Sequence, residues 1–107
     1  MKTTVGKLRN ITTGRLHTDI GQVYTFIEDY TGEKGIMTHH LPSACPALQE
    51  ILKRKLDSSW FDGEWQREGL DTEVDVPDLT EEERKEFWER FNKANAEMWE
   101  AILRIKP

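Results

Sequence analysis

A capping signature followed by a long apolar stripe dominates the C-terminal part of this 107-residue chain. Thr80 and Glu83 form a T-x-x-E capping box, in which each side chain binds the other residue's backbone N–H at a helix start. From about residue 81 to 105, apolar side chains recur every three or four residues, which predicts a long helix. One face carries Phe87, Phe91, Ala94, Met98, Ile102 and Ile105, and Trp88, Trp99 and Leu103 broaden it on one side. So wide a face must pack on a core supplied by the rest of the chain, unless its Trp88–Trp99 edge stays exposed for a partner.

Residues 18–32 have the spacing of another helix. Four of their apolar positions follow an i, i+3, i+4, i+7 pattern: Ile20, Val23, Tyr24 and Ile27. Thr18 or Asp19 is suited to cap the start of this helix, and Gly32 is suited to end it.

A third helix is expected after a proline-containing stretch. In residues 47–56, the apolar positions with helical spacing are Leu48, Ile51, Leu52 and Leu56. Ser43 is well placed as the N-cap, which leaves Pro46 in the first turn, where a missing N–H costs little. Pro42 biases Leu41 away from the helical region, so the helix is expected to begin after both.

Two further segments have the composition to form extended structure. Residues 5–12 fit either a short helix that breaks at Gly14 or a strand. In TEVDV (residues 72–76), valines alternate with acids, which suits an edge strand ended by Pro77. Trp60, Phe61 and Trp65 surround the turn signal Asp62-Gly63, so a short β-hairpin between 60 and 77 is an option.

These elements predict a mainly α fold, with α+β as the variant if the hairpin forms. The length suits a single domain over residues 1–107 with three or four helices and one modest core. No apolar run approaches the roughly 20 residues that span a bilayer, and MKTTVGKLRN has no apolar segment typical of a secretory signal. With one cysteine the chain has no internal disulfide, and the expected compartment is the cytoplasm.

The net charge of −5 conceals a strongly acidic block. Residues 62–89 hold twelve Asp/Glu against three Lys/Arg, a balance of −9, and both flanking segments are mildly basic. The ordinary interpretation is a solvated surface and an acidic helix start. The alternative is a contact surface for a basic partner, whereas direct binding of DNA or RNA is disfavoured because phosphates are repelled. The expected contact set is Asp71, Glu73, Asp75, Asp78, Glu82, Glu86, Trp88 and Trp99.

The stretch IMTHHLPSACP (residues 36–46) combines two adjacent histidines with the single cysteine. At a helix N-terminus Cys45 would have a lowered thiol pKa, and His39 or His40 would be its partner in a nucleophile pair. No oxyanion loop, glycine-rich elbow or third member accompanies them, so Cys45 is interpreted as a small buried apolar residue. Adjacent histidines on extended backbone point to opposite sides and do not chelate one ion together. No catalytic residue, metal or cofactor is therefore predicted.

TTGR (residues 12–15) brings hydroxyls, a glycine and a guanidinium together, a set that suits a phosphate or carboxylate. It lacks the spacing of the Walker and dinucleotide-binding motifs. In the simpler interpretation, the threonines make local hydrogen bonds in a turn and Gly14 adopts a positive φ. Arg15 then pairs with an acidic side chain. The competing hypothesis is a small-molecule-binding or nucleotide-binding protein, or an enzyme, with a pocket formed by Thr13, Arg15, His17, His39 and Cys45, and with Thr12 and Thr38 beside them.

Three segments in order carry a family resemblance: TTGRL (12–16), VYTFIEDYTGEKG (23–35) and MTHHLPSAC (37–45). They resemble a family of small uncharacterised proteins found largely in bacteriophages and prophages, with the pattern TTGRL, a VY-containing helix, a YMTGD-like turn and THQLPRA. The resemblance covers about residues 7–56. His40 stands where the pattern has Gln and Ser43 where it has Arg, which weakens a basic site at the helix start.

The resemblance implies a phage-borne accessory protein acting in the host cytoplasm. With the acidic block and no strong catalytic signature, it leads us to expect a non-enzymatic binder that inhibits a basic host protein, including nucleic-acid-binding defence proteins of the CRISPR type. No membrane partner is expected. A homodimeric virion or assembly component is a further alternative.

Overall fold

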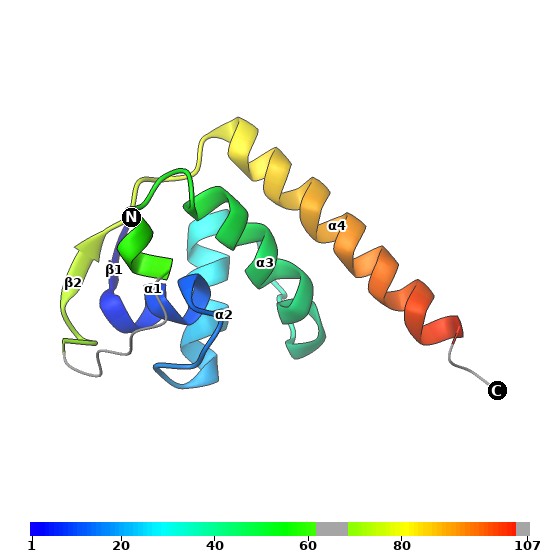
Figure 1. The fold of residues 1–107 in the computed structure, drawn as a ribbon, viewed down its shortest axis with the longest axis horizontal. Coiled ribbons are helices and arrows are strands. Elements are labelled where there is room, and N and C mark those ends of the chain that lie inside the picture. Colours follow the sequence, from blue (N-terminus) through cyan, green and yellow to red (C-terminus); the bar gives the residue numbers. More distant parts are fainter. Residues whose placement is uncertain (62–68, 105–107) are drawn as a thin grey trace.

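Within residues 1–61 and 69–104, which the structure describes, the computed structural model contains four α-helices and one two-stranded sheet (Figure 1). The elements in chain order are β1 (Lys2–Thr4), α1 (Val5–Thr12), α2 (Ile20–Thr31), α3 (Leu41–Leu52), β2 (Glu73–Asp75) and α4 (Glu81–Arg104). Short 3₁₀ turns lie at Thr38–His40 and Ser58–Phe61. The predicted mainly α fold with a small β component is confirmed.

The segment that fitted either a helix or a strand forms helix α1. Its N-cap is Thr4, whose extended backbone (φ −114°, ψ 158°) lets the hydroxyl accept a hydrogen bond from the Lys7 N–H. The Gly6 N–H donates to the carbonyl of Leu70 at 2.9 Å. The first turn of α1 is therefore joined to a segment more than sixty residues away in sequence.

Helix α2 ends at the predicted residue. Gly32 adopts a left-handed conformation (φ 77°), and its N–H donates to the carbonyl of Glu28. Such a conformation carries little steric cost for glycine, which explains the stop. Asp19 is the N-cap as expected, although its side chain makes no capping hydrogen bond.

Helix α3 begins earlier than predicted. The expectation that Ser43 is the N-cap was wrong, because the helix starts at Leu41 and follows directly from the Thr38–His40 turn. Leu41 has helical backbone angles (φ −58°, ψ −41°), so the following proline does not keep it out of the helix. Pro42 lies in the first turn, where it needs no N–H donor, and Ser43 is buried at 2% exposure. Pro46 lies inside the helix.

The predicted strand at 72–76 is confirmed as β2, but its partner is not a neighbouring strand. β2 pairs antiparallel with β1 at the N-terminus, with Lys2 opposite Asp75. Trp60 and Phe61 belong to a 3₁₀ turn, and the predicted turn at Asp62-Gly63 lies outside the described residues. Local turn signals favoured a hairpin, whereas the pairing that forms is set by the tertiary fold.

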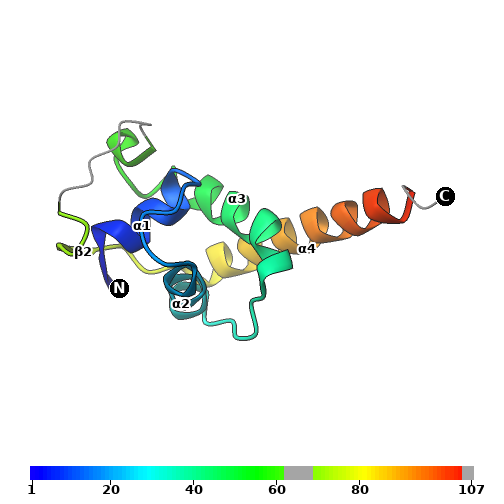
Figure 2. The ribbon, with the colours of Figure 1, turned by 90° about the horizontal axis from the view of Figure 1, so that it is seen from below.

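The core lies between α1, α2, α3 and the first half of α4. Its members come from each of these helices and from the β2–α4 connection: Leu8, Ile11, Val23, Phe26, Ile27, Tyr30, Ala44, Ala47, Leu48, Ile51, Leu52, Val76, Leu79, Phe87 and Phe91. Helix α4 packs on α3 and gives the core only Phe87 and Phe91. Its second half extends past the other elements in both views (Figures 1 and 2), and the molecule measures 48 × 30 × 25 Å.

Candidate interaction surfaces

The far end of α4 exposes an apolar patch. Trp99, Ile102 and Leu103, here called the distal patch, are 46%, 44% and 60% exposed. The only aromatic ring that the structure places against Trp99 among the described residues is that of His39, with centroids 6.3 Å apart. Sequence spacing identified this face of the helix, but it did not show where burial would stop. Full burial ends at Phe91 and Met98 is the last half-buried residue of the described chain, because α4 then extends past the start of α3.

Trp88, the other predicted tryptophan anchor, is half-buried in the fold. Its indole N–H donates to Glu33 Oε1 at 2.7 Å, and its ring lies edge-on to Phe91 at 5.5 Å. A buried indole N–H needs such a partner, and Glu33 supplies it from the loop after α2. Trp88 therefore ties α4 to that loop, and Trp99 is the more accessible of the two tryptophans.

Two acids of the long helix are engaged inside the molecule. Glu83 accepts from Lys55 at 2.7 Å, with side chains only 18% and 14% exposed, and it also completes the predicted capping box with Thr80. Burial opposes ionisation of Glu83, but the hydrogen bonds from Lys55 and Thr80 prevail and lower its pKa. Glu86 pairs with Arg54 at 2.6 Å and with Arg90 at 2.9 Å. The Arg54 hydrogen bond, above all, lowers the pKa of Glu86.

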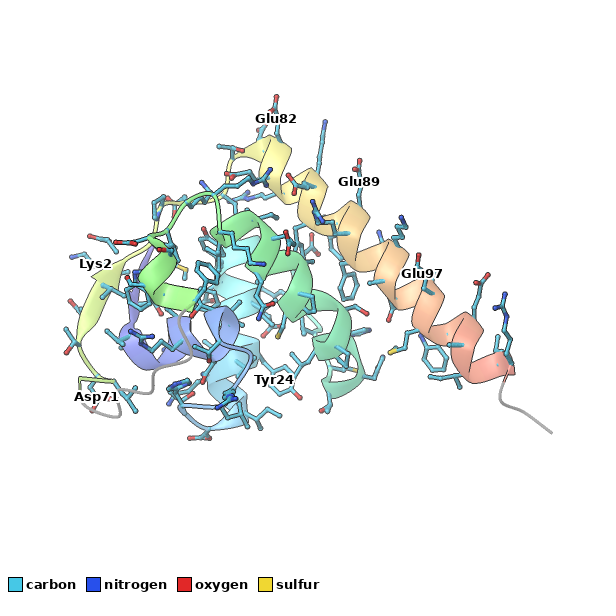
Figure 3. All side chains as sticks on the ribbon, in the orientation of Figure 1. Lys2, Tyr24, Asp71, Glu82, Glu89 and Glu97 are labelled. Atoms are coloured by element: carbon cyan, nitrogen blue, oxygen red, sulfur yellow. The ribbon has the colours of Figure 1, made fainter. Side chains whose placement is uncertain are left out.

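The remaining predicted acids lie in two separate regions. Asp71, Glu73 and Asp75 are exposed along β2 and the turn before it, whereas Glu82 is exposed on the outer side of α4 (Figure 3). Between them, Asp78 pairs with the Met1 ammonium at 2.8 Å, which lowers the pKa of this carboxyl. Two exposed acids of α4 were not in the predicted set: Glu89, which points away from the core on the side of Glu82 (Figure 3), and Glu97, which lines the hollow between α3 and α4. The seven-residue spacing from Glu82 to Glu89 is the sequence signal that would have included Glu89.

The alternative pocket residues do not converge on one site. Arg15 and Cys45 line a common groove between the α1–α2 connection and α3, together with Thr38. Thr13 instead closes the local turn: its hydroxyl donates to the carbonyl of Arg9 and accepts from the Arg15 N–H. Gly14 has the expected positive φ of 69°, whereas Arg15 forms no ion pair with any acid of residues 1–61 and 69–104.

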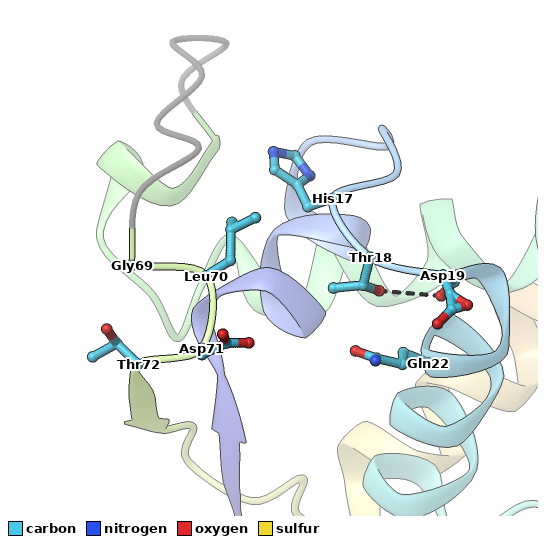
Figure 4. A pocket seen from close by; sticks show the side chains of 8 residues that line it. All are labelled: His17, Thr18, Asp19, Gln22, Gly69, Leu70, Asp71 and Thr72. Atoms are coloured by element: carbon cyan, nitrogen blue, oxygen red, sulfur yellow. Dashed lines mark hydrogen bonds between the residues drawn. The ribbon is translucent and has the colours of Figure 1, made fainter.

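His17 lines a different hollow of about 680 Å³ (Figure 4). There, His17, Thr18 and the start of α2 face residues 69–72 across the hollow. The His17 N–H donates to Asn10 Oδ1 at 2.6 Å, and Asn10 in turn donates to the Thr18 hydroxyl. Its imidazole Nδ1 lies 2.9 Å from the carbonyl oxygen of Arg15. The backbone of His17 therefore contacts Asn10, and its ring contacts the backbone of Arg15.

The adjacent histidines have structural contacts. The rings of His39 and His40 lie 4.0 Å apart, and that of His40 is edge-on to Phe91. His40 Nδ1 accepts the N–H of Met37, and burial together with the neighbouring His39 lowers its pKa. Within the described ranges, no group of three or more His, Cys, Asp or Glu side chains is arranged to hold a metal ion.

Cys45 does not lie at the helix N-terminus, where a thiol would be activated as a nucleophile. Because α3 starts at Leu41, Cys45 is the fifth residue of the helix and lies beyond the first turn. Burial raises the pKa of its thiol from 9.0 to about 11. At neutral pH the sulfur is therefore protonated, which is the state of an apolar packing residue and not of an attacking thiolate.

Comparison with known proteins adds a family for about half of the chain. Among the described residues, no helix is both long and apolar enough to cross a membrane. No curated protein and no solved structure matches the chain. Residues 4–56, which include α1, α2 and α3, match the family described as Domain of unknown function (DUF7736), and α4 lies outside the match.

Proposed function

We propose that this protein is a non-catalytic, phage-encoded inhibitor that binds a basic host protein through α4. The target class is a nucleic-acid-binding defence protein, such as a CRISPR-type effector, and the site of action is the host cytoplasm. The observation that carries the proposal is the distal patch, where Trp99, Ile102 and Leu103 remain exposed on a helix that projects past its own core. Exposed aromatic and aliphatic clusters of this kind are typical anchors of protein interfaces.

The acids along α4 support a basic partner, and most of them precede the patch, which lies in the mildly basic segment after residue 89. Glu97 and Glu100 are exposed beside the patch, and Glu82 and Glu89 continue the carboxylates along α4 toward β2. At a rise of 1.5 Å per residue, Glu82 lies about 25 Å from Trp99, so these acids steer the approach of a partner more than they contact it. Phosphates are repelled by the same field, which favours competition with nucleic acid over binding to it.

The family match is consistent with an accessory role. The first three helices lie in the segment that matches an uncharacterised domain family, and the projecting helix lies outside that match. A shared helical scaffold with a separate recognition helix is a common way to direct one domain to different targets. The resemblance of TTGRL and MTHHLPSAC to phage and prophage proteins supports the viral setting.

The test is affinity capture from nuclease-treated bacterial extract with the full chain and with Trp99→Ala/Leu103→Ala. The wild-type protein is expected to retain a basic protein whose capture weakens as salt rises, and the double variant should lose at least about tenfold in binding. The captured protein should then bind nucleic acid less tightly when the wild-type chain is added. Met37→Ala is the control, because Met37 is 59% exposed but lies between α2 and α3.

Three results would contradict the proposal. Equal capture by the wild type and the double variant would show that the distal patch is not part of the interface. A captured protein that keeps its full affinity for nucleic acid would remove the inhibitory role. Sedimentation showing a dimer that the double variant converts to a monomer, with no captured protein, would assign the patch to self-association.

A further inference from the structure

The groove beside Arg15 is separate from the α4 surface and lies within the matched family domain. It has a volume of about 480 Å³, and none of its lining residues belongs to α4. Its walls are mainly apolar: Leu16, Ile20, Val23, Leu41, Pro42 and Pro46. This size and composition fall within the usual range for small-molecule sites, which span about 300–1,000 Å³.

The groove joins the two segments that carry the strongest family resemblance. TTGRL contributes Gly14, Arg15 and Leu16 to its lining, and MTHHLPSAC contributes Thr38 and Cys45, among others. Some twenty residues separate the two segments in sequence. Residues of both motifs therefore line one surface, although neither motif forms a site alone.

Hydrogen bonds fix the walls of the groove. Gln49 reaches from α3 to the carbonyl of Ile11 at the end of α1, with Nε2 2.8 Å from the oxygen. Tyr24 on α2 and Thr38 before α3 share a hydroxyl hydrogen bond of 2.5 Å. Gly14 suits the connection between α1 and α2, since its φ of 69° is unfavourable for other residues. The apolar surface is therefore held open while Leu16 and Ile20 remain 54% and 44% exposed.

The charge of the groove is unusual for this acidic chain. Arg15 is its one charged lining residue, and no described acid pairs with that guanidinium. The hollow of Figure 4 contains Asp19 and Asp71, and the hollow between α3 and α4 contains Glu50 and Glu97. Among these three hollows, only the groove presents a cation beside apolar walls without a carboxylate.

We infer that the groove binds a small amphipathic anion, an apolar body of a few carbon atoms that ends in a carboxylate. The apolar body lies against Leu16, Ile20 and Leu41, where it removes their surface from water. The carboxylate pairs with Arg15, whose planar fork suits two parallel hydrogen bonds. The positive charge of Arg15 disfavours cationic ligands. The neutral thiol of Cys45 contributes apolar surface to the groove and does not react with the ligand.

Sodium octanoate, kept below its micelle concentration, is the probe for a ¹H–¹⁵N NMR titration of the full chain. The expected result is saturable shifts confined to the amides around Gly14–Leu16, α2 and the start of α3. Octan-1-ol, which has the same chain without charge, should bind more weakly. Arg15→Gln should weaken octanoate binding about tenfold or more, because a charge-assisted hydrogen bond is lost. Arg84→Gln, the same change at an exposed position of α4, should leave the affinity unchanged.

The inference is overturned if octanoate produces no saturable shifts, or if octanol binds as tightly as octanoate. Equal affinity for the wild type and Arg15→Gln, with both spectra showing the native fold, also overturns it. Shifts confined to the distal patch would mean that the fatty chain only coats exposed apolar surface. Tighter binding of an uncharged leucine-containing peptide to the groove would assign it to a protein segment instead.

Discussion

Gly6 marks the closest approach of α1 to the segment before β2. A Cβ atom at this position would lie 2.9 Å from Thr18 Cγ2 and 3.2 Å from the carbonyl oxygen of Leu70. The carbonyl cannot withdraw easily, because it accepts the Gly6 N–H. We therefore expect Gly6→Ala to lower the free energy of unfolding by about 1–3 kcal/mol, measured by urea denaturation.

Gly21→Ala is the control for this prediction. Gly21 lies near the start of α2, where an added Cβ would meet no atom within 4 Å, and its φ is not positive. The same substitution should therefore stabilise the protein by about 0.5 kcal/mol, through reduced freedom of the unfolded chain. Equal effects of the two substitutions would show that the contact with Leu70 does not constrain α1.

Cys45 makes a second prediction at the residue scale. With its thiol pKa raised to about 11, iodoacetamide should alkylate the native protein slowly at pH 7.5 and faster as the pH rises toward that value. Unfolding in urea at pH 7.5 should accelerate the reaction strongly. Because the folded state holds this proton more tightly than the unfolded state, its contribution to stability is complete below about pH 9 and is lost as the pH rises toward 11. Native alkylation as fast as in urea, followed by mass spectrometry, would contradict the burial of Cys45.

At the scale of an element, the start of α4 depends on Thr80. Its hydroxyl accepts the Glu83 N–H at 3.1 Å, while its own N–H donates to the Glu83 carboxylate at 2.9 Å. Thr80→Ala should lower the free energy of unfolding by about 1 kcal/mol, the usual cost of a lost N-cap. Thermal and urea unfolding followed by circular dichroism provide the measurement.

Thr25→Ala tests whether this cost belongs to the cap. Thr25 is exposed inside α2, where its hydroxyl only donates back to the Gly21 carbonyl. Alanine has the higher helix propensity, so this variant should be neutral or slightly more stable. A loss of stability equal to that of Thr80→Ala would mean that the capping box contributes nothing of its own.

The elements that could be predicted from sequence are those with local causes. The bounds of α4 follow from Thr80 and the apolar stripe, and the end of α2 follows from Gly32, because caps and periodicity act within a few residues. The start of α3 was missed because the proline rule for Leu41 is only a bias, which the Thr38–His40 turn outweighs. The partner of β2 was missed because strand pairing between residues 2–4 and 73–75 has no local signal.

For the candidate surfaces too, local sequence identified residues, but tertiary packing decided where they lie. The apolar edge that includes Trp99 could be read from spacing, but its exposure depends on where α3 stops covering α4. Arg15 and Cys45 line one groove, whereas His17 lines another hollow and His39 lies near Trp99, since the course of the chain after each motif decides which side it faces. Local chemistry selected candidate residues, and tertiary packing selected among them.

For the whole molecule, the matched family segment does not close its own core. Residues 4–56 supply most of the buried side chains, but Val76, Leu79, Phe87 and Phe91 come from outside the match. Tyr30 on α2 also donates its hydroxyl to the carbonyl of Pro77 at 2.6 Å. The segment after β2 is therefore part of the folding unit, and only the second half of α4 extends beyond it.

Two truncations test this division of α4. Removing residues 97–107 deletes the distal patch and leaves Phe87, Phe91 and Trp88 in place, so the remaining chain should unfold cooperatively with Tm lowered by less than about 10 °C. Removing residues 81–107 also deletes both core phenylalanines, each worth about 3–5 kcal/mol. That loss approaches the entire stability of a small domain, about 5–15 kcal/mol, so the shorter chain should lack a cooperative thermal transition and dispersed amide resonances. A native-like spectrum of the shorter chain would show that α4 is an appendage to a self-sufficient domain, and collapse of the longer one would show that the exposed half of α4 is part of the fold.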